Sequence, residues 1–196
     1  MTLRKWFHLF WTTLVIGIVV STVTGLVLQF SDQEFQVMGM SAVGFNVLNM
    51  ILGGATISVL SQMGFFAYLI VRFIMAGLIR SKKVWDFIQI LIILVVLYDL
   101  VYLRYTTLEG SLMSYVLMPV ILLILSIGVA YWKVKMTNFN AFTPTLFFML
   151  AVTVLEAVPA IRQDSLASSV FMLFPLFACN AWQILILHKI VDNKKS

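Results

Sequence analysis

The sequence predicts an all-α, polytopic membrane protein: a bundle of about six transmembrane helices with both ends in the cytoplasm. Three observations predict it. The chain is 62% hydrophobic and only 11% charged, whereas a soluble domain is about 45–50% apolar and about 25% charged. It contains six apolar stretches long enough to cross a bilayer, and its basic residues are distributed asymmetrically between the loops. We expect one transmembrane domain over residues 1–196 and no soluble domain.

The six expected spans follow from length, because a helix needs about 20 apolar residues to cross the hydrocarbon. They are residues 6–30, 45–69, 84–103, 112–132, 141–161 and 166–187. The first follows a basic start at Met1–Lys5. Its apolar stretch exceeds the roughly 7–15 residues of a signal-peptide core, so we expect it to be retained as a helix.

Orientation follows from the excess of Lys and Arg in cytoplasmic loops. With the N-terminus inside, only Arg104 and Arg162 of the 13 basic residues lie outside. The others are cytoplasmic: Arg4, Lys5, Arg72, Arg80, Lys82, Lys83, Lys133, Lys135, Lys189, Lys194 and Lys195. The acidic residues expected outside are Asp32, Glu34, Glu109 and Asp164. The net charge of +5 is therefore a topology signal, typical of a plasma-membrane protein, and does not indicate nucleic-acid binding.

The second span has an alternative interpretation as two helices. No charge occurs between Glu34 and Arg72, and Gly53-Gly54 lies near the middle of that stretch. Two helices would invert every later segment and leave only Arg4, Lys5, Arg104 and Arg162 inside. One span is therefore favoured, preceded by an interfacial piece at residues 36–44 and followed by an amphipathic cytoplasmic turn at residues 73–79.

Four ionisable residues lie within or at the outer ends of the third and fifth spans: Asp99, Arg104, Glu156 and Arg162. Such residues are costly in a membrane and are often functional. Each carboxylate precedes its arginine by five or six positions, or about 7–9 Å along a helix. If the two helices are neighbours, the four side chains would form a polar cluster near the outer leaflet. A structural role and a role in binding a signal, ligand or partner both remain open.

Two further features indicate contacts between helices. Gln62 lies deep in the second span and needs a partner there, and its expected partners are Asn180 and Gln183 in the last helix. The first helix carries a small-residue stripe at Gly17, Ser21 and Gly25. Such a stripe is a packing face, either within the bundle or between proteins.

The sequence argues against most enzyme classes. His8 and His188 have no Cys, Asp or Glu nearby that would complete a metal site, and Cys179 is the single cysteine. No zinc-protease, phosphate-loop or nucleophile-elbow motif occurs. We expect no enzyme activity, no metal and no cofactor. Two alternatives remain, a small transporter or channel and a membrane-embedded lipid or envelope enzyme, both using Asp99 and Glu156.

Two segments resemble the KinB-signalling pathway activation family, KbaA. The first is Ser61-Gln62-Met63-Gly64-Phe65-Phe66-Ala67-Tyr68-Leu69 followed by Arg72-Phe73, and the second is Tyr98-Asp99-Leu100-Val101-Tyr102-Leu103-Arg104. The resemblance implies an accessory membrane protein that promotes signalling by the sporulation sensor histidine kinase KinB. Its implied partners are the lipid bilayer and such a kinase, contacted laterally through helices, and a protein of this kind could bias the kinase by binding one of its states better.

Overall fold

The computed structural model describes residues 3–31, 43–107, 112–162 and 165–191. Within these ranges all regular structure is helical. The elements are α1 (Leu3–Ser31), α2 (Val43–Leu78), α3 (Lys82–Thr107), α4 (Leu112–Met136), the 3₁₀ turn η3 (Phe139–Ala141), α5 (Phe142–Phe147), the π-helix η4 (Phe148–Val152), α6 (Thr153–Ile161) and α7 (Leu166–Val191). The all-helical prediction is confirmed for the described residues.

Six helical segments are long and apolar enough to cross a membrane. Five are the single helices α1, α2, α3, α4 and α7. The sixth runs from Phe139 to Ile161 and combines η3, α5, η4 and α6. Each of the six stretches expected from the sequence therefore coincides with one long apolar helical segment.

The second span is one continuous helix of 36 residues, which settles its secondary structure in favour of one segment. At 1.5 Å per residue it is about 54 Å long, well beyond the roughly 30 Å of a hydrocarbon core. The structure differs from the sequence analysis at residues 73–79, where α2 continues to Leu78 instead of turning. No proline interrupts Arg72–Leu78, so nothing in the sequence ends the helix earlier. Of the expected interfacial piece, residues 36–42 lie outside the described residues.

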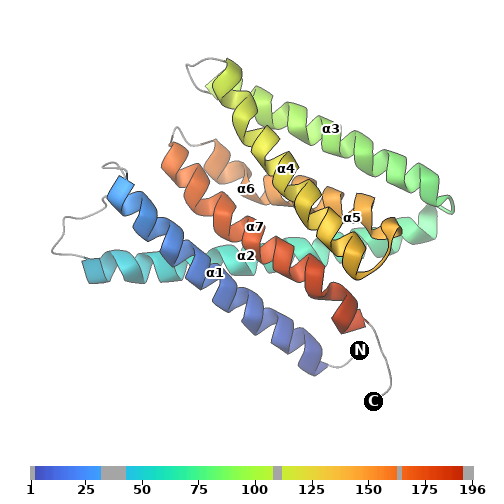
Figure 1. Ribbon diagram of the computed structural model, residues 1–196, viewed down its shortest axis with the longest axis horizontal. Coiled ribbons are helices and arrows are strands. Elements are labelled where there is room, and N and C mark those ends of the chain that lie inside the picture. Colours follow the sequence, from blue (N-terminus) through green and yellow to red (C-terminus); the bar gives the residue numbers. More distant parts are fainter. Residues whose placement is uncertain (1–2, 32–42, 108–111, 163–164, 192–196) are drawn as a thin grey trace.

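The helices cross at wide angles around a central span (Figure 1). Helix α1 packs against α2 and α7, while α3 and α4 pack against α5. The segment Phe139–Ile161 is the most buried of the six spans and α3 is the least buried. Apolar residues from several helices, including Leu100, Leu150 and Leu176, are fully buried around this central segment.

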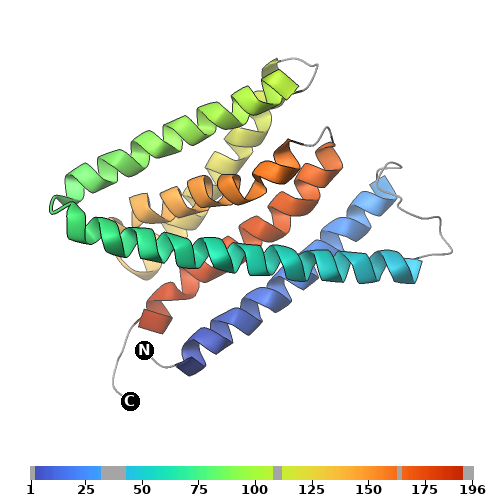
Figure 2. The same ribbon diagram turned by 180° about the vertical axis from the view of Figure 1, so that it is seen from behind.

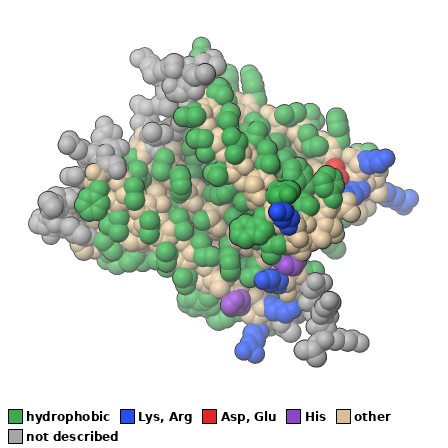
Figure 3. Space-filling model, viewed as in Figure 1, with side chains coloured by type: hydrophobic (Ala, Val, Ile, Leu, Met, Phe, Trp, Pro, Cys, Tyr) green, Lys and Arg blue, Asp and Glu red, His purple; other side chains and the backbone are tan. Residues whose placement is uncertain are grey.

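Basic side chains and connections mark one end of the bundle. The start of α1, the end of α7, and the α2–α3 and α4–α5 connections all lie at this end (Figure 2). Lys and Arg side chains gather over the same region, and apolar side chains are spread over the rest of the described surface in this view (Figure 3). We call this the basic end. The exposed apolar side chains outside the basic end are suited to contact with lipid and would be unusual on a soluble monomer.

Candidate functional site

The small-residue stripe of α1 faces α2. Ser21 Oγ donates a hydrogen bond to the Met50 carbonyl oxygen over 3.1 Å. A Cβ atom added at Gly17 would lie 2.7 Å from Ser58 Cβ and 2.8 Å from the Gly54 carbonyl oxygen. At Gly25 an added Cβ would lie 2.7 Å from Met50 Cγ. These glycines allow the two backbones to approach closely, so the stripe is occupied within the bundle.

A buried polar network joins α2 to α7 at mid-span. Ser61 Oγ donates to Asn180 Oδ1 over 2.7 Å. Gln183 Nε2 donates in turn to Ser61 Oγ over 2.8 Å. All three side chains are fully buried. Each therefore uses its partners to satisfy polar atoms that lipid could not satisfy.

The same network extends to α6 through Asn180. Its Nδ2 donates to Thr153 Oγ1 over 2.9 Å and to Glu156 Oε2 over 3.0 Å. Thr153 is fully buried, and Glu156 is partly buried. We refer to Ser61, Thr153, Glu156, Asn180 and Gln183 as the polar network. It links three helices that are far apart in sequence.

Two acceptor atoms of the network are buried without a hydrogen-bond partner among the described residues: Glu156 Oε1 and Gln183 Oε1. The first lies against Gly64 of α2, where an added Cβ would overlap the Glu156 carboxylate. Glycine at position 64 is thus what admits the carboxyl group between the helices. Unpaired acceptors in a low-dielectric site are costly, so these two oxygens are the unsatisfied positions of the network.

A π-helix immediately precedes the residues that α6 contributes. Residues Phe148–Ala151 of η4 are buried, and the Phe148 ring packs 5.6 Å from Phe65 and 4.9 Å from Tyr68. Tyr68 Oη also donates to the Pro144 carbonyl oxygen over 3.2 Å. Single π-turns inside helices are frequent at functional sites. Here Phe148 of the π-helix packs against the Phe65 and Tyr68 rings of α2.

Gln62 bonds to different partners from those expected. Its Nε2 lies 3.3 Å from Ser58 Oγ and 3.5 Å from the Phe10 carbonyl oxygen, so it joins α2 to α1. Asn180 and Gln183 instead meet Ser61. Neighbouring residues on a helix point about 100° apart, and that rotation directs Ser61, not Gln62, toward α7.

The four ionisable residues singled out in the sequence are only partly brought together. The third and fifth spans do pack against each other. Asp99 is exposed on α3, and Arg162 is exposed at the end of α6. Among the side chains that the structure describes, no ion pair joins Glu156 to Arg162. The Arg104 side chain lies outside the described part, so its pairing with Asp99 stays a prediction.

Lys133 is a buried contact that the sequence analysis treated only as a basic loop residue. It is 5% exposed, and its Nζ donates to the Ile184 carbonyl oxygen over 2.6 Å and to that of Leu185 over 3.2 Å. His188 Nδ1 lies 3.3 Å away. The lysine therefore ties α4 to α7. Lys133 lies in the last turn of α4, after its apolar stretch, and no sequence signal there distinguishes a buried lysine from an exposed one.

Nothing in the described part of the chain groups three or more His, Cys, Asp or Glu residues as a metal site would require. The geometry instead resembles that of helices held together by polar contacts.

The chain is similar to a known protein family and to a member of it. Residues 17–190 match the family described as KbaA, KinB-signalling pathway activation in sporulation. The chain is 36% identical over 185 residues to the KinB-signaling pathway activation protein of Bacillus subtilis (strain 168). The aligned region covers 92% of this chain and 93% of that protein. No solved structure matches.

Proposed function

This chain belongs to the KinB-signalling pathway activation family, and from that premise we propose that it promotes signalling by a membrane sensor histidine kinase through lateral contact between transmembrane helices. The observation that carries the proposal is similarity over nearly the whole length of both proteins. The relative is named for activating a signalling pathway, which favours a regulator over an enzyme. Without chemistry of its own, such a protein acts by binding one state of its partner better than the other.

The proposed orientation places the basic end in the cytoplasm of a plasma-membrane protein. Support comes from the distribution of Lys and Arg between the two ends of the six spans. Cysteine labelling in a Cys179→Ser background tests it, with cysteines at Lys83 and Lys135 on the basic end and at Asp32, Glu109 and Asp164 on the other. Lys135 is used because Lys133, two residues before it, is buried. Labelling of position 83 by an impermeant outside reagent would contradict this orientation.

We place the kinase contact on the outward face of α3. The small-residue stripe of α1 is already covered by α2. Helix α3 is the least buried span and presents Leu94 (59% exposed) and Tyr98 (67% exposed). The Tyr98 and Tyr102 rings stack with centroids 6.0 Å apart, so their side chains are already ordered for contact with a partner helix.

The decisive experiment measures kinase autophosphorylation in reconstituted membranes with and without this protein. We expect stimulation that Leu94→Ala and Tyr98→Ala weaken several-fold, because truncating aromatic and apolar contact residues removes packing across the interface. Ile124→Ala on α4 is the matched control, because Ile124 is 62% exposed on another helix. It should leave stimulation unchanged.

Two outcomes would contradict the proposal. Equal losses of kinase stimulation in all three variants would show that the kinase contact does not lie on α3. If the pair neither associates nor changes kinase activity, and the protein alone moves a solute or modifies a lipid, the transporter or enzyme alternative replaces the accessory function. Neutralising Glu156 would then test whether its unpaired oxygen serves that activity.

A further inference from the structure

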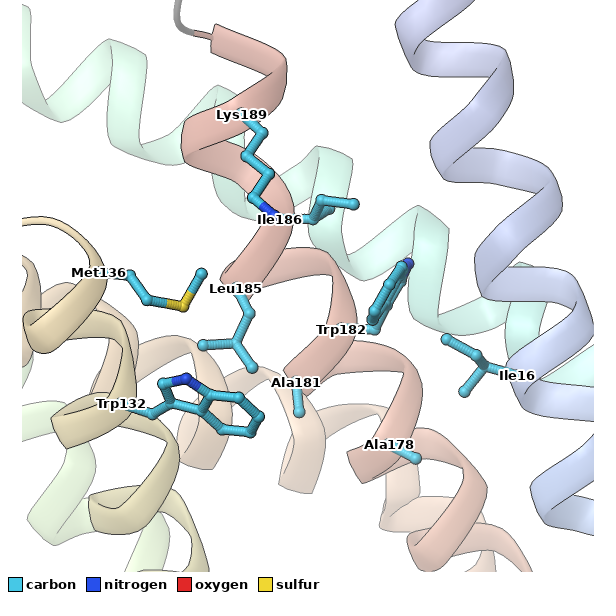
Figure 4. A pocket seen from close by; sticks show the side chains of 9 residues that line it. All are labelled: Ile16, Trp132, Met136, Ala178, Ala181, Trp182, Leu185, Ile186 and Lys189. Carbon is cyan, nitrogen blue, oxygen red and sulfur yellow. The ribbon is translucent and has the colours of Figure 1, made fainter.

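A groove with a volume of about 380 Å³ runs between α1, α4 and α7. Its walls are almost entirely apolar. Figure 4 shows side chains from the three helices arranged around the same space. They include Ile16 of α1, Trp132 and Met136 of α4, and Ala178, Trp182 and Lys189 of α7. Trp182 is fixed in place because its Nε1 donates to Thr12 Oγ1 of α1 over 3.0 Å.

The length of the groove corresponds to one leaflet of a bilayer. Ala178 and Lys189 lie at its two extremes along α7, about 16 Å apart at 1.5 Å per residue. The hydrocarbon core is about 30 Å thick, so the groove extends from the basic end to roughly the midplane. An acyl chain of one leaflet spans half of that thickness, so its length matches the length of the groove.

Within the described residues of α1, α4 and α7, the Lys, Arg, Asp and Glu side chains are all basic. The three helices that form it contain no acidic residue. Their Lys and Arg residues all lie toward the basic end: Arg4, Lys5, Lys133, Lys135 and Lys189. The mouth of the groove is therefore electrostatically complementary to an anion at the level of the lipid headgroups.

Two of these lysines lie near the C-terminal end of α7. Lys189 lines the groove and is exposed, and in Figure 4 its side chain runs beside Ile186. Lys5 Nζ donates to the Lys189 carbonyl oxygen over 3.4 Å, which places a second ammonium group at the end of α7. Lys133 is buried, and its Nζ donates to two carbonyl oxygens of α7.

We propose that this groove binds an anionic phospholipid, with one acyl chain along Trp132 and Ala178 and the headgroup phosphate held by Lys189 and Lys5. An apolar trough one leaflet long with cations at one end matches the shape and charge of such a lipid. A zwitterionic lipid would fill the same groove. Its headgroup carries a cationic group beside the phosphate, so its electrostatic attraction to the two lysines is weaker. The inference stands independently of the kinase contact proposed on α3.

Quenching of tryptophan fluorescence by brominated lipids tests the proposal. The protein carries Trp6→Phe, Trp11→Phe and Trp85→Phe, so that the two tryptophans of the groove report alone. It is reconstituted into phosphatidylcholine vesicles containing either brominated phosphatidylglycerol or brominated phosphatidylcholine at equal mole fraction. We expect stronger, saturable quenching by phosphatidylglycerol. Lys189→Gln should lower the apparent preference roughly five-fold, as expected for one basic side chain attracting an anionic lipid.

Controls separate this site from the general charge of the basic end. Lys83→Gln removes the same charge at the start of α3 and should leave the preference unchanged. Ala181→Leu fills the groove and should reduce quenching by both lipids. Mass spectrometry of the unsubstituted protein, purified in mild detergent, should also detect retained phosphatidylglycerol that Lys189→Gln loses. Equal quenching by the two lipids, or equal effects of Lys83→Gln and Lys189→Gln, would overturn the proposal.

Discussion

Adding one methyl group at Gly64 should break the contact between α2 and α6. The Cβ of Gly64→Ala would overlap the Glu156 carboxylate and lie 3.0 Å from Val152 Cγ1. The carboxyl group must move away, which breaks the 3.0 Å bond from Asn180 Nδ2 to Glu156 Oε2. Overpacking costs about 1–3 kcal/mol, and an interhelical hydrogen bond in a membrane contributes about 0.6–2 kcal/mol. We therefore expect a loss of about 1.6–5 kcal/mol in the free energy of unfolding.

A second substitution turns this into a test of the contact itself. In a Glu156→Ala background the space beside position 64 is vacated, so adding Gly64→Ala should change stability by less than about 1 kcal/mol. Gly77→Ala, on the same helix with nothing within 4 Å of its added Cβ, is the matched control. It should be nearly neutral in either background.

Cys179 provides the assay, because it is the single cysteine in the chain and is fully buried. A thiol-reactive fluorophore reports its exposure as the detergent-solubilised protein is heated. We expect Gly64→Ala alone to lower the midpoint of unfolding. Added to Glu156→Ala, the same substitution should shift the midpoint much less. Gly77→Ala should leave the midpoint nearly unchanged in either background. If Gly64→Ala destabilises the protein equally with and without Glu156, the carboxylate does not occupy that space and the reasoning fails.

Two further predictions concern helix contacts. Gly17→Leu should lower the thermal midpoint, with a cost of at least about 1–3 kcal/mol, because its Cβ would meet Ser58 and the Gly54 backbone. Gly128→Leu on α4, in open space, is its control, and equal shifts would exclude a close α1–α2 contact. Lys133→Met should destabilise the protein by about 1.5–3 kcal/mol, the contribution of hydrogen bonds to a charged group. Lys135→Met should not, because the Lys135 amine lies over the exposed Tyr131 ring, and indistinguishable melting curves would contradict a structural role for Lys133.

Hydropathy and charge were sufficient to predict the six apolar helices, because both report directly on the solvent each segment meets. They also favoured a single second span over two, and α2 is one helix. Its extension through Phe73, which is 82% exposed, was not predicted, since no residue there signals either continuation or termination. The spacing of apolar residues shows that a helix has an apolar face, but it does not show which neighbouring helix that face contacts.

The polar network shows where one sequence is not enough. Asn180 and Gln183 were identified together with a polar partner on the second span, and the structure supplies that partner one residue away, at Ser61. The orientation of α2 about its own axis decides between Ser61 and Gln62, and that angle depends on packing against α1 and α7. Lys133 was misread for a related reason. A lysine at the end of an apolar stretch has the same sequence signature whether it extends to water or to a neighbouring helix.

The π-helix at Phe148–Val152 lets the central span hold one residue more than a continuous α-helix would need. An α-helix turns by about 100° per residue. In α-geometry that extra residue would turn Thr153 and Glu156 away from Asn180 while Phe148 kept its place beside Phe65 and Tyr68. The wider π-turn absorbs the residue locally, so both groups of contacts are kept. Deleting one residue at these five positions should therefore leave the orientation of α6 unchanged, whereas inserting a second would rotate it by about 100°.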